Sequence, residues 1–252
     1  MQGTRSLSPV SAAERLIVAL DVDTVAAAES LVDALSGAVG MFKIGKQLFV
    51  HAGPDIVRRV HDRGGEVFLD LKFHDIPQTV ALAGIEAMRL GVRMFDVHAG
   101  GGAAMMRATA DAASAASATE GHALPLVIAV TVLTSLDQTE LRELGIASGV
   151  PKQVERLARL AAANGMAGVV ASPHEARLIR RACGADFVIV TPGVRPAAAG
   201  WDDQKRVMTA ADAIEAGADY LVVGRPIRDA PNPRAAAEAL TVEMAAAFAA
   251  RV

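Results

Sequence analysis

Eight short apolar runs recur along the chain and alternate with segments of helical periodicity. The runs span residues 16–20, 41–44, 67–71, 94–97, 126–130, 168–171, 187–190 and 220–223. Most of them are continuous and bulky, which is typical of strands buried on both faces, and their strict alternation with helices indicates parallel pairing through right-handed crossovers. Eight such units predict an α/β fold that closes into a single (β/α)8 TIM barrel.

The segments between these runs have the spacing of amphipathic or alanine-rich helices. They span residues 26–35, 56–62, 80–90, 103–113, 154–163, 176–182 and 210–216, and residues 234–250 supply the last helix. Thr24 and Thr209 are expected to cap two of them. An open doubly wound sheet has the same alternation and is the alternative architecture, and in both folds the chemistry lies at the carboxyl ends of the strands.

The chain has 252 residues, close to the roughly 250 residues of a single barrel. No linker or change of composition divides it, so we expect one domain over residues 1–252. The polar residues 1–14 are expected to form a loosely ordered N-terminal tail. Hydrophobic residues make up 52% of the chain and aromatic residues only 4%, which suits a core of Ala, Val, Leu and Ile beneath alanine-rich helices.

Charge and cysteine content exclude several classes of protein. The chain carries 25 basic and 28 acidic residues, a net charge of −3, so no basic surface for a nucleic acid is expected. A single cysteine, Cys183, excludes an internal disulfide framework.

The longest apolar stretch, residues 123–136, contains Pro125 and is too short to span a bilayer as a helix. Because residues 1–14 also lack the apolar core of a signal peptide, we expect a cytoplasmic protein with no membrane partner.

Charged side chains gather at the ends of the first three predicted strands. Asp21 follows the first strand, Lys43 lies in the second, Asp70 and Lys72 close the third, and Asp75 lies just beyond. Period-two alternation places Asp70 and Lys72 on one face of their strand. Buried charges are costly to desolvate unless they pair, so the alternating signs predict an array in which Lys72 stays protonated and the carboxylates stay ionised. An ordinary exposed ion pair is the alternative, which the matching positions of the other charges disfavour.

Glycine and arginine follow the last two predicted strands, where barrels often bind phosphate. Gly193 and Arg195 lie after the seventh strand, and Gly224 and Arg225 lie after the eighth. Glycine lets backbone N–H groups approach an anion, and arginine offers a forked pair of donors. Residues 196–206 lack helical periodicity at their start, which predicts a mobile lid over this site.

The histidines lack the spacing of metal ligands, so no metal site is predicted. His51, His61 and His122 are interpreted as surface or helix-end residues. His98 closes the fourth strand in the sequence Asp96-Val97-His98, and a structural hydrogen bond is the favoured interpretation. His74 lies inside the charged motif of the third strand, and its direction stays open.

Taken in order, these motifs resemble the orotidine 5'-phosphate decarboxylase family in its compact bacterial type. The resemblance rests on Leu20-Asp21, Phe42-Lys43-Ile44-Gly45, Asp70-Leu71-Lys72-Phe73-His74-Asp75-Ile76-Pro77, Val97-His98-Ala99, residues 129–135, residues 191–196, residues 203–207 and Val223-Gly224-Arg225-Pro226. The motifs cover all eight predicted strands.

The resemblance implies decarboxylation of orotidine 5'-phosphate to uridine 5'-phosphate and CO2, the last step of de novo UMP synthesis, without a cofactor or a metal. By similarity, Lys72 would be the proton donor to C6, and the catalytic residues would be Lys72, Asp70, Asp75 and Lys43. The implied substrate-binding residues are Asp21, Lys43, Ile76, Thr79, Thr134, Pro192, Arg195, Gln204, Gly224 and Arg225. The resemblance also implies a homodimer with shared active sites, in which Asp75 reaches into the neighbouring subunit's site.

Two other functions stay open from the sequence. The first is a metal-dependent sugar-phosphate decarboxylase or an aldolase-like barrel, because relatives of that kind share the Asp-x-Lys strand and use magnesium. The second is a barrel without catalytic activity that binds a phosphorylated ligand as a sensor or scaffold.

Overall fold

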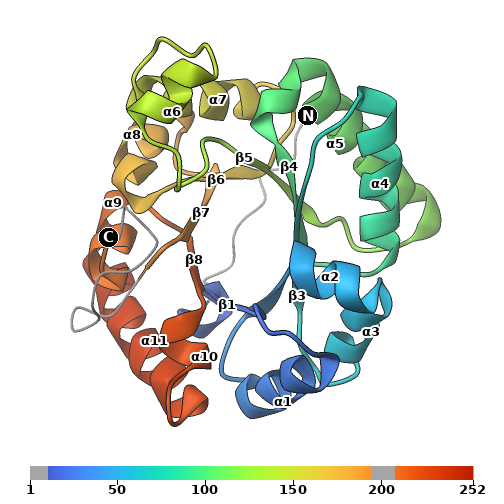
Figure 1. Ribbon diagram of the computed structural model, residues 1–252, viewed down its shortest axis with the longest axis vertical. Coiled ribbons are helices and arrows are strands. Elements are labelled where there is room, and N and C mark those ends of the chain that lie inside the picture. The colour runs from blue at the N-terminus through green and yellow to red at the C-terminus, as the bar shows by residue number, and fades with distance from the viewer. Residues whose placement is uncertain (1–10, 195–207, 252) are drawn as a thin grey trace.

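The computed structural model of the chain describes residues 11–194 and 208–251. Its eight strands pair in parallel and close into a barrel in the order β1-β2-β3-β4-β5-β6-β7-β8. Figure 1 shows the ring of strands at the centre and the helices around it. The predicted (β/α)8 barrel is therefore confirmed, and the open doubly wound sheet is excluded because β1 also pairs with β8.

The strands coincide with the predicted apolar runs. Their bounds are β1 Leu16–Ala19, β2 Met41–Gly45, β3 Val67–Phe73, β4 Met94–His98, β5 Leu126–Val130, β6 Gly168–Val170, β7 Val188–Pro192 and β8 Tyr220–Val223. The ends differ from the predicted ones by at most two residues.

Every predicted helical segment is helical in the structure. The helices are α1 Val25–Leu35, α2 Lys46–Ala52, α3 Asp55–His61, α4 Pro77–Arg89, α5 Gly102–Glu120, α6 Gln138–Glu143, α7 Val150–Ala162, α8 Pro173–Cys183, α9 Ala210–Ala216, α10 Arg225–Arg228 and α11 Pro233–Ala250, with 3-10 turns η1 Ala13–Arg15 and η2 Ala99–Gly101. Thr24 and Thr209 cap α1 and α9, since each side chain accepts a hydrogen bond from a backbone N–H of the first turn. The short helices α2, α6 and α10 were not predicted.

Residues 1–10 of the expected N-terminal tail lie outside the described residues. The rest of that segment is held locally, because the Ser11 backbone N–H donates a hydrogen bond to Glu14 Oε2 at 2.7 Å at the start of η1. In the part of the chain that the structure describes, no helix has both the length and the apolar character needed to cross a bilayer.

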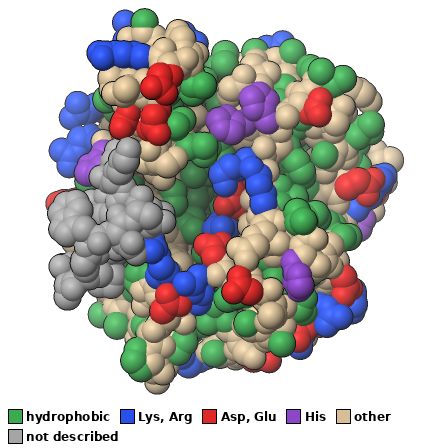
Figure 2. Space-filling view, viewed as in Figure 1, with side chains coloured by type: hydrophobic (Ala, Val, Ile, Leu, Met, Phe, Trp, Pro, Cys, Tyr) green, Lys and Arg blue, Asp and Glu red, His purple; other side chains and the backbone are tan. Residues whose placement is uncertain are grey.

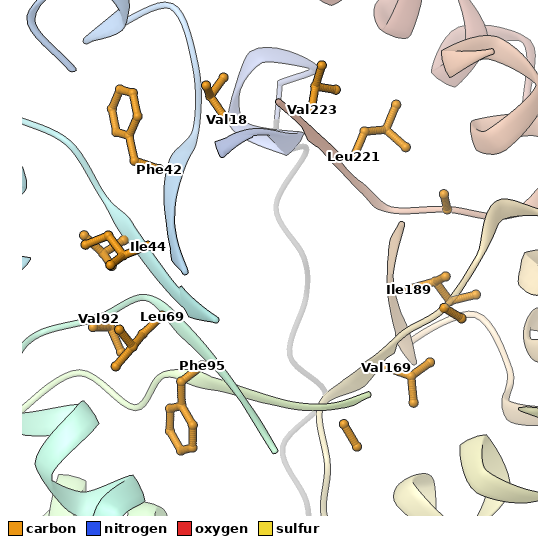
Figure 3. Packing of buried hydrophobic residues seen from close by; sticks show 14 of the residues in the cluster. Val18, Phe42, Ile44, Leu69, Val92, Phe95, Val169, Ile189, Leu221 and Val223 are labelled. Carbon is orange, nitrogen blue, oxygen red and sulfur yellow. The ribbon is translucent and has the colours of Figure 1, made fainter. Parts of the chain in front are cut away.

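Alternate residues of each strand point into the barrel or out toward the helices, as the pleat of a strand requires. The outward set packs against the helix layer, and Figure 3 shows members of this outer cluster, among them Phe42, Leu69 and Phe95. The inward set forms a separate inner cluster that includes Met41, Phe68, Met94, Val188 and Tyr220. This apolar filling makes much of the barrel interior a packed core.

Arg180 of α8 binds groups near the starts of β7 and β8, at the end of the barrel opposite the carboxyl ends of the strands. Its guanidinium donates to Asp219 Oδ2 at 2.5 Å, and Asp219 Oδ2 also accepts from the Ile189 backbone N–H at 2.8 Å. Four backbone carbonyls accept further hydrogen bonds from Arg180, those of Gly184, Ala185, Phe187 and Gly217. Because the side chains of Arg180 and Asp219 are only 17% and 11% exposed, this network replaces water around both charges.

An Arg180→Ala variant is expected to lose about 3 kcal/mol of unfolding free energy, the range for removing one partner of a buried ion pair. The change removes the closer guanidinium partner of Asp219, which keeps only the more distant Arg251 at 3.6 Å, and it leaves the four carbonyls without this donor. Urea unfolding followed by circular dichroism measures the loss. Arg177→Ala, at an exposed position of the same helix, is the control and should change the free energy by less than about 0.5 kcal/mol. Equal effects of the two substitutions would show that the network around Asp219 does not stabilise the barrel.

Candidate active site

A cavity of about 350 Å³ opens at the carboxyl ends of the strands. Figure 2 shows it as a hollow in the middle of this face, where basic and acidic side chains meet between apolar ones. Eight of the residues predicted to form a site line it: Asp21, Lys43, Asp70, Lys72, Thr134, Pro192, Gly224 and Arg225. Apolar residues such as Val130, Val170 and Val222 line the rest, so the cavity combines a charged wall with an apolar one.

The charged wall is a row of alternating signs. Lys43 Nζ lies 3.2 Å from Asp21 Oδ1 and 3.2 Å from Asp70 Oδ2. Lys72 Nζ donates a hydrogen bond to Asp70 Oδ1. The order along the row is therefore Asp21, Lys43, Asp70, Lys72. Asp21 and Lys72, at the two ends of the row, are 52% and 25% exposed, whereas Lys43 and Asp70 between them are each 12% exposed. The middle of the row is therefore its most buried part.

The row stabilises its own charges. Burial acts against the ionised form of Asp70, but Lys43, hydrogen bonding with Asp96 and the nearby Lys72 outweigh it and lower the pKa of Asp70 to about 2. Burial likewise opposes the charge of Lys43, and the carboxylates of Asp70 and Asp21 outweigh it and raise the pKa of Lys43. At neutral pH Asp70 is therefore a fixed negative charge between two ammonium groups.

The backbone of Lys72 departs from a regular strand. Its φ of 53° makes it the one residue other than glycine with positive φ in residues 11–194 and 208–251. The register between β3 and β4 also shifts between Leu69 and Phe73. The Lys72 backbone N–H donates at 2.8 Å to Oδ1 of Asp96, to which no role was assigned from the sequence. A left-handed conformation is costly for a lysine, so this turn is maintained by its surroundings.

Arginine and glycine line the cavity after the last two strands. Gly193, Gly224 and Arg225 lie there as predicted, and Gly193 has a φ of 78°, which favours glycine. Arg228 also lines the cavity and donates to the backbone carbonyl of Asp21 at 2.5 Å. Arg228 was not predicted from the sequence, although it lies three residues after Arg225 on α10, which puts both on one side of that helix turn. Arg195, Gln204 and the expected lid at 196–206 lie outside the described residues.

Three predicted site residues lie away from this cavity. Asp75, Ile76 and Thr79 are exposed at the start of α4 and are not among the residues that line it. Asp75 Oδ1 accepts a hydrogen bond from the Ile76 backbone N–H at 2.6 Å, and Ile76 is 66% exposed. Leu82 of the same helix is 53% exposed.

His74 and His98 form a stacked pair beside the charged row. Their ring centroids lie 5.3 Å apart with an interplanar angle of 20°. Burial, and then the neighbouring His74 and Lys72, lower the pKa of His98. Nδ1 of His98 is buried and has no hydrogen-bond partner among the described residues, so the expected structural hydrogen bond is not formed at that atom. Over the described ranges, no group of three or more His, Cys, Asp or Glu side chains is arranged to hold a metal ion.

Comparison with known proteins assigns the chain to a family. The model of the orotidine 5'-phosphate decarboxylase / HUMPS family matches residues 14–240. The chain belongs to this family. Its members include the orotidine 5'-phosphate decarboxylase of Syntrophotalea carbinolica, which is 58% identical over 239 residues, covering 95% of this chain and 98% of that relative. The orotidine 5'-phosphate decarboxylase of Moorella thermoacetica is 57% identical over 234 residues, covering 92% of this chain and 93% of that relative.

A solved structure of the same family has the same barrel. The crystal structure of orotidine 5'-phosphate decarboxylase from Lactobacillus acidophilus aligns with a TM-score of 0.81 at 37% identity. The alignment covers 91% of this chain and 98% of that structure. The likeness therefore extends over the barrel as a whole.

Proposed function

We propose that the chain decarboxylates orotidine 5'-phosphate to uridine 5'-phosphate and CO2, as its relatives' names describe, without a metal or organic cofactor. The observation that carries the proposal is the alternating row from Asp21 to Lys72, on the wall of a cavity in a member of this family. The activity makes the chain a carboxy-lyase of pyrimidine biosynthesis.

The chemistry requires a fixed positive charge at C6 of the pyrimidine. When the bond from C6 to the carboxylate breaks, its electron pair stays on C6, where no adjacent carbonyl can delocalise it and no cofactor supplies an electron sink. An ammonium held next to C6 stabilises this carbanion and then donates the proton that forms the C6–H bond. Lys72 is the residue we assign to both roles, and it regains its proton from water after the product leaves.

Asp70 is assigned to the substrate carboxylate. With a pKa of about 2, it is ionised at every pH at which the protein would work. A negative charge beside the departing carboxylate raises the energy of the bound substrate relative to the transition state. Asp70 also accepts the hydrogen bond from Lys72 Nζ and therefore aims the ammonium group.

The remaining residues hold the rest of the nucleotide. Asp21 and Lys43 are assigned to the ribose hydroxyls. Thr134 and Pro192 are assigned to the edge of the pyrimidine, and both line the cavity. The phosphate is assigned to four residues: Arg195, Gln204, Gly224 and Arg225. Because the phosphate is remote from C6, binding energy gained there can be used to orient the base and lower the barrier.

We propose further that the active form is a homodimer with shared sites. Asp75, Ile76 and Thr79 lie on the exposed start of α4 and outside their own cavity, which suits residues that contact a neighbouring subunit. Ile76 and Leu82 add exposed apolar surface on the same helix. In this assembly Asp75 of one subunit completes the charged row of the other.

We also propose that the chain forms a single domain and that the protein is cytoplasmic. The described strands and helices form one closed barrel, which supports a single domain over residues 1–252. The likeness to enzymes of nucleotide synthesis, together with a single cysteine, supports a cytoplasmic location.

The direct test is the loss of pyrimidine absorbance when the purified protein meets orotidine 5'-phosphate in buffer with EDTA. We expect turnover that is unaffected by the chelator. Turnover of a sugar phosphate that needs added magnesium would favour the alternative within the same family. Tight binding of uridine 5'-phosphate with no turnover of either substrate would favour a binding protein.

Arg225→Ala is expected to lower kcat/KM for orotidine 5'-phosphate by about 10- to 150-fold, the equivalent of about 1.5–3 kcal/mol for a lost hydrogen bond to a charged group. The cause is the loss of a forked donor to the phosphate. Steady-state kinetics measure the change. Arg234→Ala serves as the control, because Arg234 lies on α11, pairs with Glu238 and does not line the cavity. An unchanged kcat/KM in Arg225→Ala would remove this residue from the phosphate site.

A further inference from the structure

Asp96 is a buried acid to which neither the sequence analysis nor the proposed function assigns a task. It lies in the middle of β4 and is 0% exposed. Met94, two residues earlier, belongs to the inner cluster, so alternation along the strand also points Asp96 into the barrel. A fully buried carboxyl group needs partners to offset its desolvation.

One oxygen of Asp96 has such a partner in the backbone of Lys72. Oδ1 accepts from the Lys72 N–H at 2.8 Å. Leu69 pairs with Phe95 and Phe73 pairs with Val97, so residues 70–72 of β3 face Asp96 alone on β4. In such a bulge, the hydrogen bonds between the two strands cannot reach every backbone N–H and C=O group. The Asp96 side chain therefore accepts the hydrogen bond of the Lys72 N–H in place of a β4 carbonyl.

The Asp96 carboxyl also lies beside Asp70 of the charged row. Oδ2 of Asp96 is buried with no hydrogen-bond donor to it among the described residues. Burial, and then the charge of Asp70, raise the pKa of Asp96 well above its usual range. Two ionised carboxylates offer only acceptor oxygens, so Asp96 and Asp70 can share a hydrogen bond only when one of them carries a proton. Since Asp70 is held ionised by Lys43 and Lys72, the proton belongs on Asp96.

We propose that Asp96 is a positioning residue for the catalytic pair: Oδ1 holds the Lys72 backbone in its left-handed turn, and the protonated Oδ2 donates to Asp70. The inference deepens the proposed function and rests on it for its kinetic consequence. Asp96 does not touch the reacting atoms. It acts by fixing where the Lys72 ammonium and the Asp70 carboxylate point.

The physical consequence follows from the conformation of Lys72. A lysine at φ 53° is held there against its preference for the extended conformation. Without the acceptor on Asp96, the backbone can relax toward a regular strand and carry Nζ away from C6. A displacement of about 1 Å at a reacting group can cost about 100-fold in rate.

Three substitutions at Asp96 distinguish the effects of the shape, the polarity and the charge of its side chain. Asp96→Asn keeps an acceptor for Lys72 and a donor for Asp70, and it should retain kcat within about threefold of the parent, as expected for a neutral isostere. Asp96→Ala and Asp96→Leu, the second of which keeps the site filled, should lower kcat by about 10- to 100-fold with KM changed less than about threefold. Parental kcat in a folded Ala or Leu variant would overturn the proposal. An Asn variant as impaired as Leu would overturn the protonated form of Asp96.

A second readout does not depend on activity. The ionisable groups that face Asp96 are Asp70 and Lys72 of β3, whereas β5 on its other side is Leu126–Val130 and carries no charge. A carboxyl whose pKa is raised by folding stabilises the fold below about pH 4, its unfolded pKa, and that stabilisation is lost as the pH rises toward the folded pKa.

Because asparagine does not titrate, the Tm of Asp96→Asn minus the parental Tm should increase between pH 5 and pH 8. A difference that stays constant or decreases over this range would show that Asp96 is ionised and would overturn the proposal. This measurement stands even if the parent protein fails to decarboxylate orotidine 5'-phosphate, so the failure of the proposed function and the failure of the inference are distinguishable.

Discussion

Lys72→Ala is expected to lower kcat for orotidine 5'-phosphate by on the order of 10⁴-fold or more, since it removes both a general acid and a preset charge at the developing carbanion. The protein should still fold. Lys72 is 25% exposed, and Asp70 keeps its ion pair with Lys43 at 3.2 Å in the variant. The absorbance assay gives kcat, and circular dichroism with a thermal melt reports folding.

A matched lysine controls for the loss of a positive charge. Lys152 is exposed at the start of α7 and does not line the cavity, so Lys152→Ala should keep the parental kcat. If the folded Lys72→Ala variant kept a kcat within about tenfold of the parental value, the proton donor would have to be another group. Loss of general acid catalysis alone lowers the rate by about 100-fold or more.

Asp75→Ala is expected to be as inactive as Lys72→Ala when each is assayed alone, and a mixture of the two should regain activity. In a mixed dimer, the subunit with intact Lys72 receives an intact Asp75 from its partner, while the other site lacks both groups. With random exchange of equal amounts, half of the dimers are mixed and each has one working site. Recovery should therefore approach about a quarter of the parental specific activity.

A second mixture provides the control for shared sites. Lys72 and Asp70 belong to the row of one subunit, so a mixture of Lys72→Ala with Asp70→Ala leaves every site without one of them and should recover nothing. Subunit exchange is verified by pairing a tagged with an untagged variant. If exchange occurs and neither mixture recovers activity, each site is built from one subunit and the proposed role of Asp75 is wrong.

The barrel was predictable because its strands are buried on both faces and therefore stand out as apolar runs. The runs at 126–130 and 220–223 coincide with β5 and β8. Helix α6 could also have been found, since Asp137 and Glu140 form a capping box at its start. Helix α10 has only four residues, too few for a hydrophobic period to emerge. Helix α2 begins at Lys46, directly after β2 ends at Gly45, so no turn separates it from the strand.

The site residues that lie at or just after the carboxyl end of a strand could be predicted from the sequence. Period-two alternation brought Asp70 and Lys72 together, although Lys72 occupies a bulge and not a regular strand. The left-handed backbone of Lys72 has no local signal, because it depends on an acceptor supplied by Asp96 of β4. Asp96 itself interrupts an apolar strand at an inward-facing position, and that pattern marks a buried polar contact but does not identify its partner.

The central claim is that the ammonium of Lys72 lies against C6 of a bound pyrimidine nucleotide. A crystal structure of the protein with uridine 5'-phosphate measures this directly. The account predicts Lys72 Nζ within about 3–3.5 Å of C6, the separation of groups poised to react, with Asp70 still bound to Lys72 and the phosphate at Arg225. A nucleotide bound with Lys72 turned toward solvent, or with its phosphate rather than its base against the charged row, would contradict the account.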